Sequence, residues 1–247
     1  MDKELRELVK NLFKANKQIK EMWKDNLNSY VRGYLSYETI PILGETPYIL
    51  TQIGLKKGII RTLQRTLKKI REKHSQAWNN IEDILDYIAD PVAVFGSINK
   101  DQKDSIIVIT DKPINSRDGD NTKKELLTVI LTPSGQIKNT DGHYCILASV
   151  YGFNEHDIHK HLKGEKNESG EFLGTLKYIE KEKALKVADV SSLQGASALM
   201  LGWNNFKSNN TILTKSDIVN KYLQEKNISE DIQKKLPIDF AAREKEG

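Results

Sequence analysis

The sequence predicts an α+β fold, in which helices pack on a four- to five-stranded antiparallel sheet behind an N-terminal helical extension. Apolar residues recur at helical spacing through most of the chain before Pro91. After Pro91, short runs rich in valine and isoleucine alternate with turn-forming segments, as in consecutive strands. This order of helices followed by strands favours a meander whose one face is covered by the preceding helices.

Three regions are expected in the 247 residues: a helical extension over 1–40, a main domain over 41–190 and a polar, partly helical tail over 191–247. Between Lys3 and Tyr34 the apolar spacing predicts one long or two shorter amphipathic helices. Their apolar face needs a partner, either the following domain or a second copy of the chain. Pro41, Gly44 and Pro47 then break the pattern and mark a linker, whereas the tail should be peripheral.

Composition sets limits on the compartment and the partners. The single cysteine, Cys145, lies in an apolar run, so intramolecular disulfides are excluded and the thiol is expected to be a small core residue in a reducing compartment. The chain has no apolar run of membrane-spanning length, and its first residues do not resemble a signal peptide. We therefore expect a protein made in the cytoplasm, with no membrane partner.

The stretch from Gly54 to His74 concentrates positive charge, with eight cations against one anion, although the whole chain carries only +4. Its apolar residues step by three and four and predict one helix: Ile60, Leu63, Leu67 and Ile70. Such a charged face is either solvated surface or the electrostatic footprint of a nucleic-acid or phosphate binder.

His74 is the next step of the same apolar series, so the pattern predicts that it points inward at the end of the helix. Lys73 and Arg71 would lie at the rim and Lys69 further out. We expect burial and these cations to favour the neutral imidazole, which could then act as a base. The alternative is a histidine that only caps or fills the helix end.

Residues 77–88 predict a second amphipathic helix, and four strands are expected in the runs PVAVFGSI, SIIVIT, LLTVILTP and YCILASVY. Ser149 and Tyr151 are two apart on the last strand, so both should emerge on one face and could hold a phosphate. The alternative is that Tyr151 packs under the helix while Ser149 bonds a neighbouring strand. Ser97, at the end of the first strand, is a weaker candidate for the same pocket.

Three histidines, His156, His159 and His161, lie in a polar segment. No matching cysteine or Glu-x-x-His pattern accompanies them, so we predict exposed histidines on a surface helix, no metal site and no cofactor. Residues 174–188 predict one more strand, containing Tyr178, that leads into a charged turn. The absence of a phosphate-binding glycine loop, a Gly-x-Ser-x-Gly elbow and paired carboxylates argues against nucleotide-triphosphate hydrolysis, serine hydrolysis and glycosidase chemistry.

The succession LGETPYILTQIG, LKKIREKH, ILDYIADPVAVFGS, ILASVYG and GTLKYIEKEKAL resembles the C-terminal domain of phage MuF-type head proteins over about residues 41–190. That module also occurs in polyvalent and polymorphic-toxin proteins of mobile elements, and is placed with the barnase, EndoU, colicin D and RelE-like nucleases. The resemblance implies helices on a four-stranded antiparallel sheet and RNA cleavage without a metal.

The resemblance also implies site residues. The family's helical Lys-x-x-x-Lys-His falls on Lys69, Lys73 and His74, and its Ser-x-Tyr falls on Ser149 and Tyr151, all of which we expect to be catalytic. Four further residues are expected to bind substrate: Arg65, Arg71, the strand-end Ser97 and the later Tyr178.

The resulting hypothesis is a metal-independent endoribonuclease, acting as a toxin or effector of a phage or mobile element. A helical segment stands where the family carries a long head-protein region, which favours a free-standing toxin over a capsid role. Expected partners are RNA, including tRNA, an immunity protein or antitoxin, a phage structural protein, and a second copy bound through the N-terminal helices. Its site of action would be the cytoplasm, with delivery by a phage particle as one route. The alternative is a non-catalytic phage-head or nucleic-acid-binding module that uses the basic helix.

Overall fold

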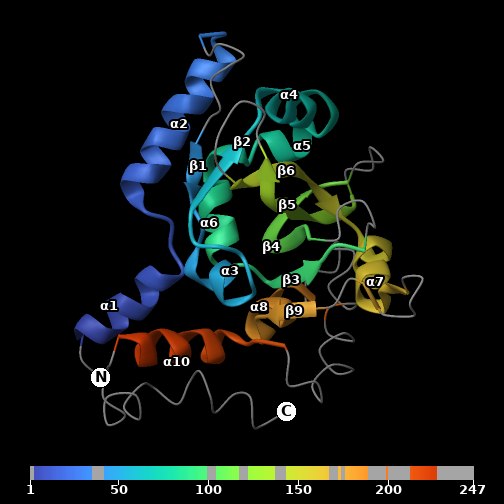
Figure 1. Ribbon diagram of the computed structural model, residues 1–247. Helices are drawn as coiled ribbons and strands as arrows, with labels where there is room; N and C mark the ends of the chain where they lie inside the picture. Colours follow the sequence, from blue (N-terminus) through green and yellow to red (C-terminus); the bar gives the residue numbers. More distant parts are fainter. Residues whose placement is uncertain are drawn as a thin grey trace.

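A central mixed sheet organises the protein (Figure 1). The computed structural model describes residues 3–34, 42–98, 104–116, 122–136, 143–166, 172–173, 176–188, 199 and 212–226. Within these residues the sheet has seven strands in the order β1-β2-β6-β5-β4-β3-β9. Their bounds are β1 Ile42–Glu45, β2 Ile59–Thr62, β3 Ala93–Gly96, β4 Ile106–Asn115, β5 Lys124–Gln136, β6 His143–Phe153 and β9 Leu176–Ile179. A separate two-stranded ribbon pairs β7 (Glu165–Lys166) with β8 (Phe172–Leu173).

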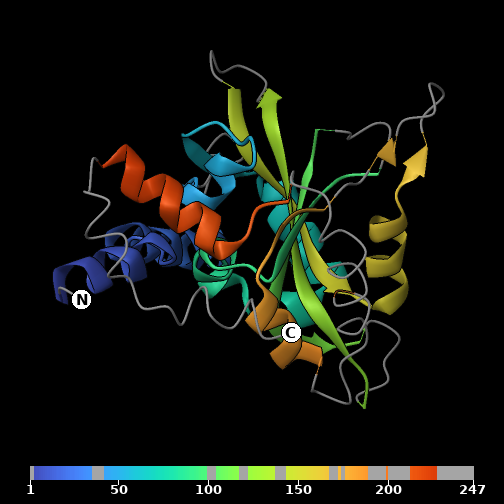
Figure 2. The ribbon, with the colours of Figure 1, turned by 90° about the horizontal axis from the view of Figure 1, so that it is seen from below.

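Helices cover both faces of the sheet (Figure 2). On one side lie α1 (Lys3–Leu12), α2 (Lys17–Val31), α3 (Tyr48–Gln52), α6 (Ile84–Ala89) and α10 (Lys215–Glu225). Buried residues of α4 (Gln64–Lys73), α5 (Ser75–Trp78) and the 3₁₀ turn η1 (Ile81–Asp83) belong to the same core. The other face is packed by α7 (Glu155–Lys163) and α8 (Lys181–Ala188). The predicted α+β class is therefore confirmed.

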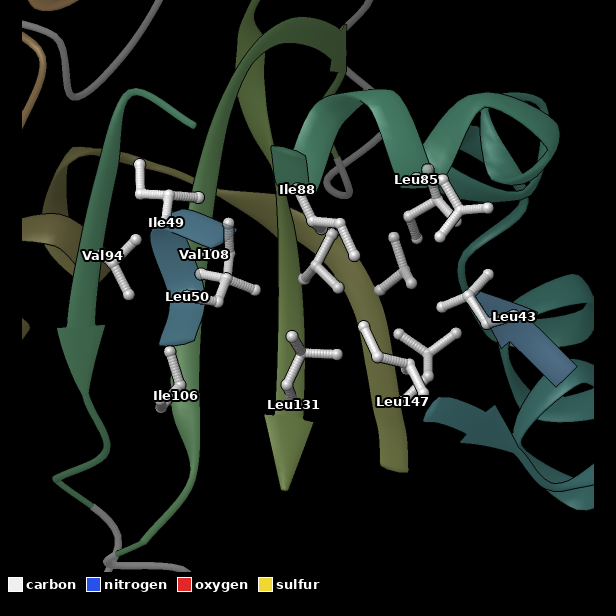
Figure 3. Close-up of a cluster of buried hydrophobic side chains, with 14 of the residues drawn as sticks. Leu43, Ile49, Leu50, Leu85, Ile88, Val94, Ile106, Val108, Leu131 and Leu147 are labelled. Atoms are coloured by element: carbon white, nitrogen blue, oxygen red, sulfur yellow. The ribbon is translucent and has the colours of Figure 1, made fainter. Parts of the chain in front are cut away.

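The four predicted strands form β3, β4, β5 and β6, which pair antiparallel in sequence order. The fifth predicted strand, which contains Tyr178, is β9 and pairs with β3. The sheet is wider than the predicted four to five strands, because β1 and β2 extend it beyond β6. Val94, Val108, Leu131 and Leu147 point from these strands into the larger core, which they share with Ile49, Leu50, Leu85 and Ile88 (Figure 3).

The prediction of a single helix over 54–74 is wrong in its first half. Residues 59–62 form β2, whose Ile60 and Thr62 pair in parallel with Cys145 and Leu147 of β6. Strand pairing with a segment far along the chain outweighs the local helical spacing here. The helix proper, α4, begins only at Gln64.

Two further element predictions need correction. Residues 77–88 do not form one helix, because α5, η1 and α6 share that stretch. The strand predicted within residues 174–188 is β9, but the charged turn predicted to follow it is helix α8. Ala184 and Val187, three residues apart, place the apolar side of α8 in the smaller core.

The N-terminal helices and the tail helix share the larger core with the sheet. Trp23 and Leu27 of α2 are buried, and Nε1 of Trp23 donates a hydrogen bond to the carbonyl of Ile81 at 2.9 Å. Most of the apolar stripe of the extension is thus covered within the chain, although Met22 and Val31 are exposed. Helix α10 also buries Ile218 and Leu223. The tail was predicted to be peripheral, and this prediction is wrong for α10, because the helix packs into the larger core.

One irregularity in β6 decides which way its later side chains face. Ser149 pairs with Ile130, but Leu147 pairs with Leu131, so Ala148 is an additional residue opposite β5. This is a β-bulge, which shifts the alternation of the strand by one position. Leu147 and Val150 point into the larger core, whereas Tyr151 and Phe153 lie on the smaller one.

Candidate functional site

His74 occupies the junction between α4 and α5, with its backbone held on both sides. Its N–H donates to the carbonyl of Ile70 at 2.9 Å, and its own carbonyl accepts the N–H groups of Ala77 and Trp78, each at 2.9 Å. Its backbone, at φ −136° and ψ 50°, ends one helix and starts the next. The position of the half-buried imidazole is therefore set by two helix ends.

The α4–α5 pair lies alongside the part of β6 that β2 leaves uncovered. Strand β2 pairs with β6 only as far as Leu147, and α4 starts two residues after β2 ends. Both α4 and α5 then contact β6. Leu67 and Ile70 of α4 are fully buried in the larger core, which fixes the helix against the sheet. His74 follows at the edge of β6.

The structure brings His74 together with Tyr151. Their ring centroids are 5.5 Å apart and the ring planes differ by 30°. Tyr151 in turn contacts Phe153, with 5.4 Å between centroids. The imidazole thus contacts an aromatic ring near the C-terminal end of β6, on the side of the smaller core.

Ser149 shares the face of Tyr151. Its cross-strand partner Ile130 belongs to the smaller core, and paired residues project to the same face. The Ser149 hydroxyl is buried, and it has no hydrogen-bond partner among the described residues. A buried hydroxyl in that state costs free energy unless a ligand or water satisfies it.

The predicted cations stand on the exposed side of α4. Arg65, Lys69 and Lys73 are exposed, and no carboxylate contacts them among the described residues. Lys68 lies 3.9 Å from Glu72 across an exposed i, i+4 pair. Arg71 is directed towards the Trp78 ring, with Cζ 6.0 Å from its centroid. The helix therefore offers solvent a dense positive face beside His74.

Two predicted substrate-binding residues lie elsewhere. Ser97 follows β3, three strands from β6, which is roughly 14 Å across the sheet at the usual strand spacing. Tyr178 in β9 is fully buried in the larger core, on the face opposite Tyr151, and burial raises the pKa of its hydroxyl well above the ordinary value. The structure brings neither residue to His74.

Sequence reasoning overlooked Glu125. This residue of β5 is only 2% exposed, and its Oε1 accepts a hydrogen bond from the Ser116 hydroxyl at 2.9 Å. Its carboxylate lies against Gly152, the residue that follows Tyr151. A signal was available, because Glu125 alternates with the core residues Leu127 and Val129 and so shares their inward face.

The three histidines do lie on a helix, α7, but they do not share one environment. His156 is exposed, and His159 lies 3.6 Å from the Glu155 carboxylate. His161 is only 8% exposed, with its ring against Phe153 and Phe95, so the prediction of three exposed histidines is wrong for this one. It follows Ile158 by three residues, which turns it towards the sheet. Within the described part of the chain, no group of three or more His, Cys, Asp or Glu side chains is placed to hold a metal.

The fold and the site geometry define an α+β module built around a basic helix that ends at a strand-edge histidine. The family described as the phage MuF-C-terminal domain matches residues 65–186, a span that runs from α4 into α8. The resemblance recognised in the sequence is thereby confirmed, and the chain has a phage association. No curated protein and no solved structure matches it. Among the described residues, no helix combines the length and the apolar character needed to cross a membrane.

Proposed function

We propose that the protein is an endoribonuclease that works by acid-base catalysis without a metal, as a toxin or effector of a phage or mobile element. The observation that carries the proposal is the contact of His74 with Tyr151 at the end of a helix whose exposed face is cationic. RNA offers this site a polyanionic backbone to bind and a 2′-hydroxyl to activate.

In the proposed reaction, the 2′-oxygen attacks the adjacent phosphorus while its proton passes to a base. The bond from phosphorus to the 5′-oxygen then breaks, and that oxygen takes a proton. His74 would serve as the base or as the acid. Lys69 and Lys73 would stabilise the charge that develops on the phosphorane. The products would be a 2′,3′-cyclic phosphate and a 5′-hydroxyl.

Ser149 and Tyr151 would position the phosphate. The buried Ser149 hydroxyl supports this role, because it lacks a hydrogen-bond partner among the described residues and lies on the same face as Tyr151. Arg65 is exposed on the same helix as Lys69 and would hold the flanking backbone. We assign this task to Arg65 rather than to Arg71, which faces the Trp78 ring.

The test is to express the chain and its His74→Ala variant in a bacterium, and to map RNA ends. The unaltered chain should produce new 5′-hydroxyl ends, and the purified protein should cut RNA in the presence of EDTA. His156→Ala is the matched control, because His156 is exposed on α7, away from this junction. If the His74→Ala variant cleaves RNA as fast as the His156→Ala control, His74 is not a catalytic residue.

The alternative function is a non-catalytic nucleic-acid-binding or phage-head module. It is favoured by the exposed Arg65, Lys69 and Lys73 alone, since a basic face binds phosphates without any catalytic group. Such a module would bind RNA less tightly as salt rises and would release no fragments. Partners such as an immunity protein or a second copy of the chain remain proposals. Most of the apolar stripe that suggested the dimer is buried within the chain, whereas Met22 and Val31 are exposed.

A further inference from the structure

A cavity that His74 does not line lies where the N-terminal helices meet the rest of the fold. A cavity of about 720 Å³ opens between α1, α2, α6, α8 and α10. Figures 1 and 2 both show α1 and α10 side by side at this end of the molecule. The volume falls within the range of about 300–1,000 Å³ that small-molecule sites occupy.

Lysines dominate the walls, with seven of them against four carboxylates. Three carboxylates already hold lysines in place. Lys20 pairs with Asp86, while Nζ of Lys183 lies 2.8 Å from Asp90 and 3.4 Å from Asp111. Nζ of Lys215 lies 3.1 Å from the same Asp90. These pairs fix the cavity wall and neutralise three of its four carboxylates.

The excess charge comes from the end of α1 and the segment that follows it. Lys10 and Lys14 both line the cavity and are exposed, and no carboxylate pairs with either among the described residues. Lys17 has only a weak exposed pair with Glu21, at 3.9 Å. The cavity therefore keeps an uncompensated positive potential, which a bound anion would neutralise.

The remaining wall is apolar and aromatic. The Phe13 ring is buried and has Nζ of Lys215 4.5 Å from its centroid, and the Tyr87 side chain lines the same space. Clustered lysines serve as point charges for phosphate, whereas planar carboxylates are matched better by arginine, which is absent from the described lining. We propose that this cavity binds a phosphate-bearing small molecule of nucleotide size.

The test uses the full chain and isothermal titration with inorganic pyrophosphate, ADP and adenosine. Pyrophosphate and ADP should bind, and adenosine should not. The double substitution Lys10→Gln and Lys14→Gln should weaken the binding of both pyrophosphate and ADP by about tenfold, since it removes two charged contacts. Lys186→Gln with Lys221→Gln is the matched control, because these exposed lysines belong to α8 and α10 but do not line the cavity.

Two comparisons identify what the cavity recognises. Equal affinity for ADP and pyrophosphate would assign recognition to the phosphates, whereas tighter ADP binding would add a base contact to the aromatic wall. The proposal is overturned if neither anion binds, if the control pair weakens binding as much as the cavity pair, or if citrate binds as tightly as pyrophosphate. Since His74 takes no part, RNA cleavage by the same variants reports separately on the nuclease proposal.

Discussion

The carboxylate of Glu125 occupies the space that a side chain on Gly152 would need. A β-carbon built at Gly152 would lie 2.1 Å from Oε2 of Glu125 and 2.7 Å from its Cβ. Glu125 is 2% exposed, and its strand is held between β4 and β6. The buried acid therefore requires a glycine at the position after Tyr151.

Gly152→Ala should destabilise the protein by roughly 1–3 kcal/mol, because the new methyl group forces Glu125 or the strand to move. Urea unfolding followed by tryptophan fluorescence measures the change. Gly58→Ala is the control, since a β-carbon there meets no atom within 4 Å. If the two variants unfold at the same urea concentration, the close approach of Glu125 to position 152 does not contribute to stability.

Tyr151→Phe should lower RNA cleavage by about ten- to a hundredfold while leaving the unfolding free energy nearly unchanged, if the hydroxyl positions phosphate as proposed. Phenylalanine keeps the ring contact with His74, so fold and imidazole placement should persist. Tyr151→Ala removes the ring as well and should reduce both cleavage and stability. Full cleavage by Tyr151→Phe would show that the ring alone matters.

Cys145 should react slowly with iodoacetamide in the folded protein. Burial raises the pKa of its thiol to about 12, so the reactive thiolate is scarce at pH 8.5, on the order of a thousandfold below that of a cysteine with the ordinary value. Mass spectrometry at timed intervals should show rapid labelling only after urea unfolding. Fast labelling without urea would contradict the burial of the thiol.

The raised pKa of Cys145 also affects stability. Ionisation of the thiol favours the unfolded chain as pH rises from about 9 towards 12, so the free energy of unfolding should fall in that window.

Trp23 should prove essential to the attachment of the N-terminal helices. Trp23→Ala is expected to cost about 3–5 kcal/mol, because the side chain is fully buried. Trp23→Phe keeps an aromatic ring but removes the hydrogen bond to the Ile81 carbonyl, so its cost should be smaller. Chemical unfolding monitored by far-ultraviolet circular dichroism gives both values. A cost near zero for Trp23→Ala would mean that the extension does not share the core.

The strands from β3 to β6 could be predicted because each is a local run of β-branched residues bounded by turn formers. Residues 59–62 could not, since their strand state depends on parallel pairing with residues 145–147, more than 80 positions later. Helix α8 was missed although Ala184 and Val187 carried its period. In that stretch the charged residues obscured a short apolar face.

The orientation of a site residue could be predicted where the local helix or strand period alone determines which way its side chain points. His74 ends a helix with a clear apolar stripe, and the spacing of Ser149 and Tyr151 places both on one face. Ser97 and Tyr178 depend on the order of strands in the sheet, which no local pattern encodes. The structure accordingly places both away from His74.

The bulge at Ala148 lets β6 carry one residue more than the strand it pairs with. A strand alternates with a period of two, so in a regular strand this extra residue would reverse every side chain beyond it. Ala148 would then lie opposite Ile130, and Tyr151 would face the larger core, out of reach of the imidazole. Deleting Ala148 would instead remove the bulge, because Ser149 would follow Leu147 directly and could keep its pairing with Ile130. The candidate site should therefore tolerate the loss of Ala148, whereas the loss of Val150 would turn Tyr151 to the opposite face of the sheet.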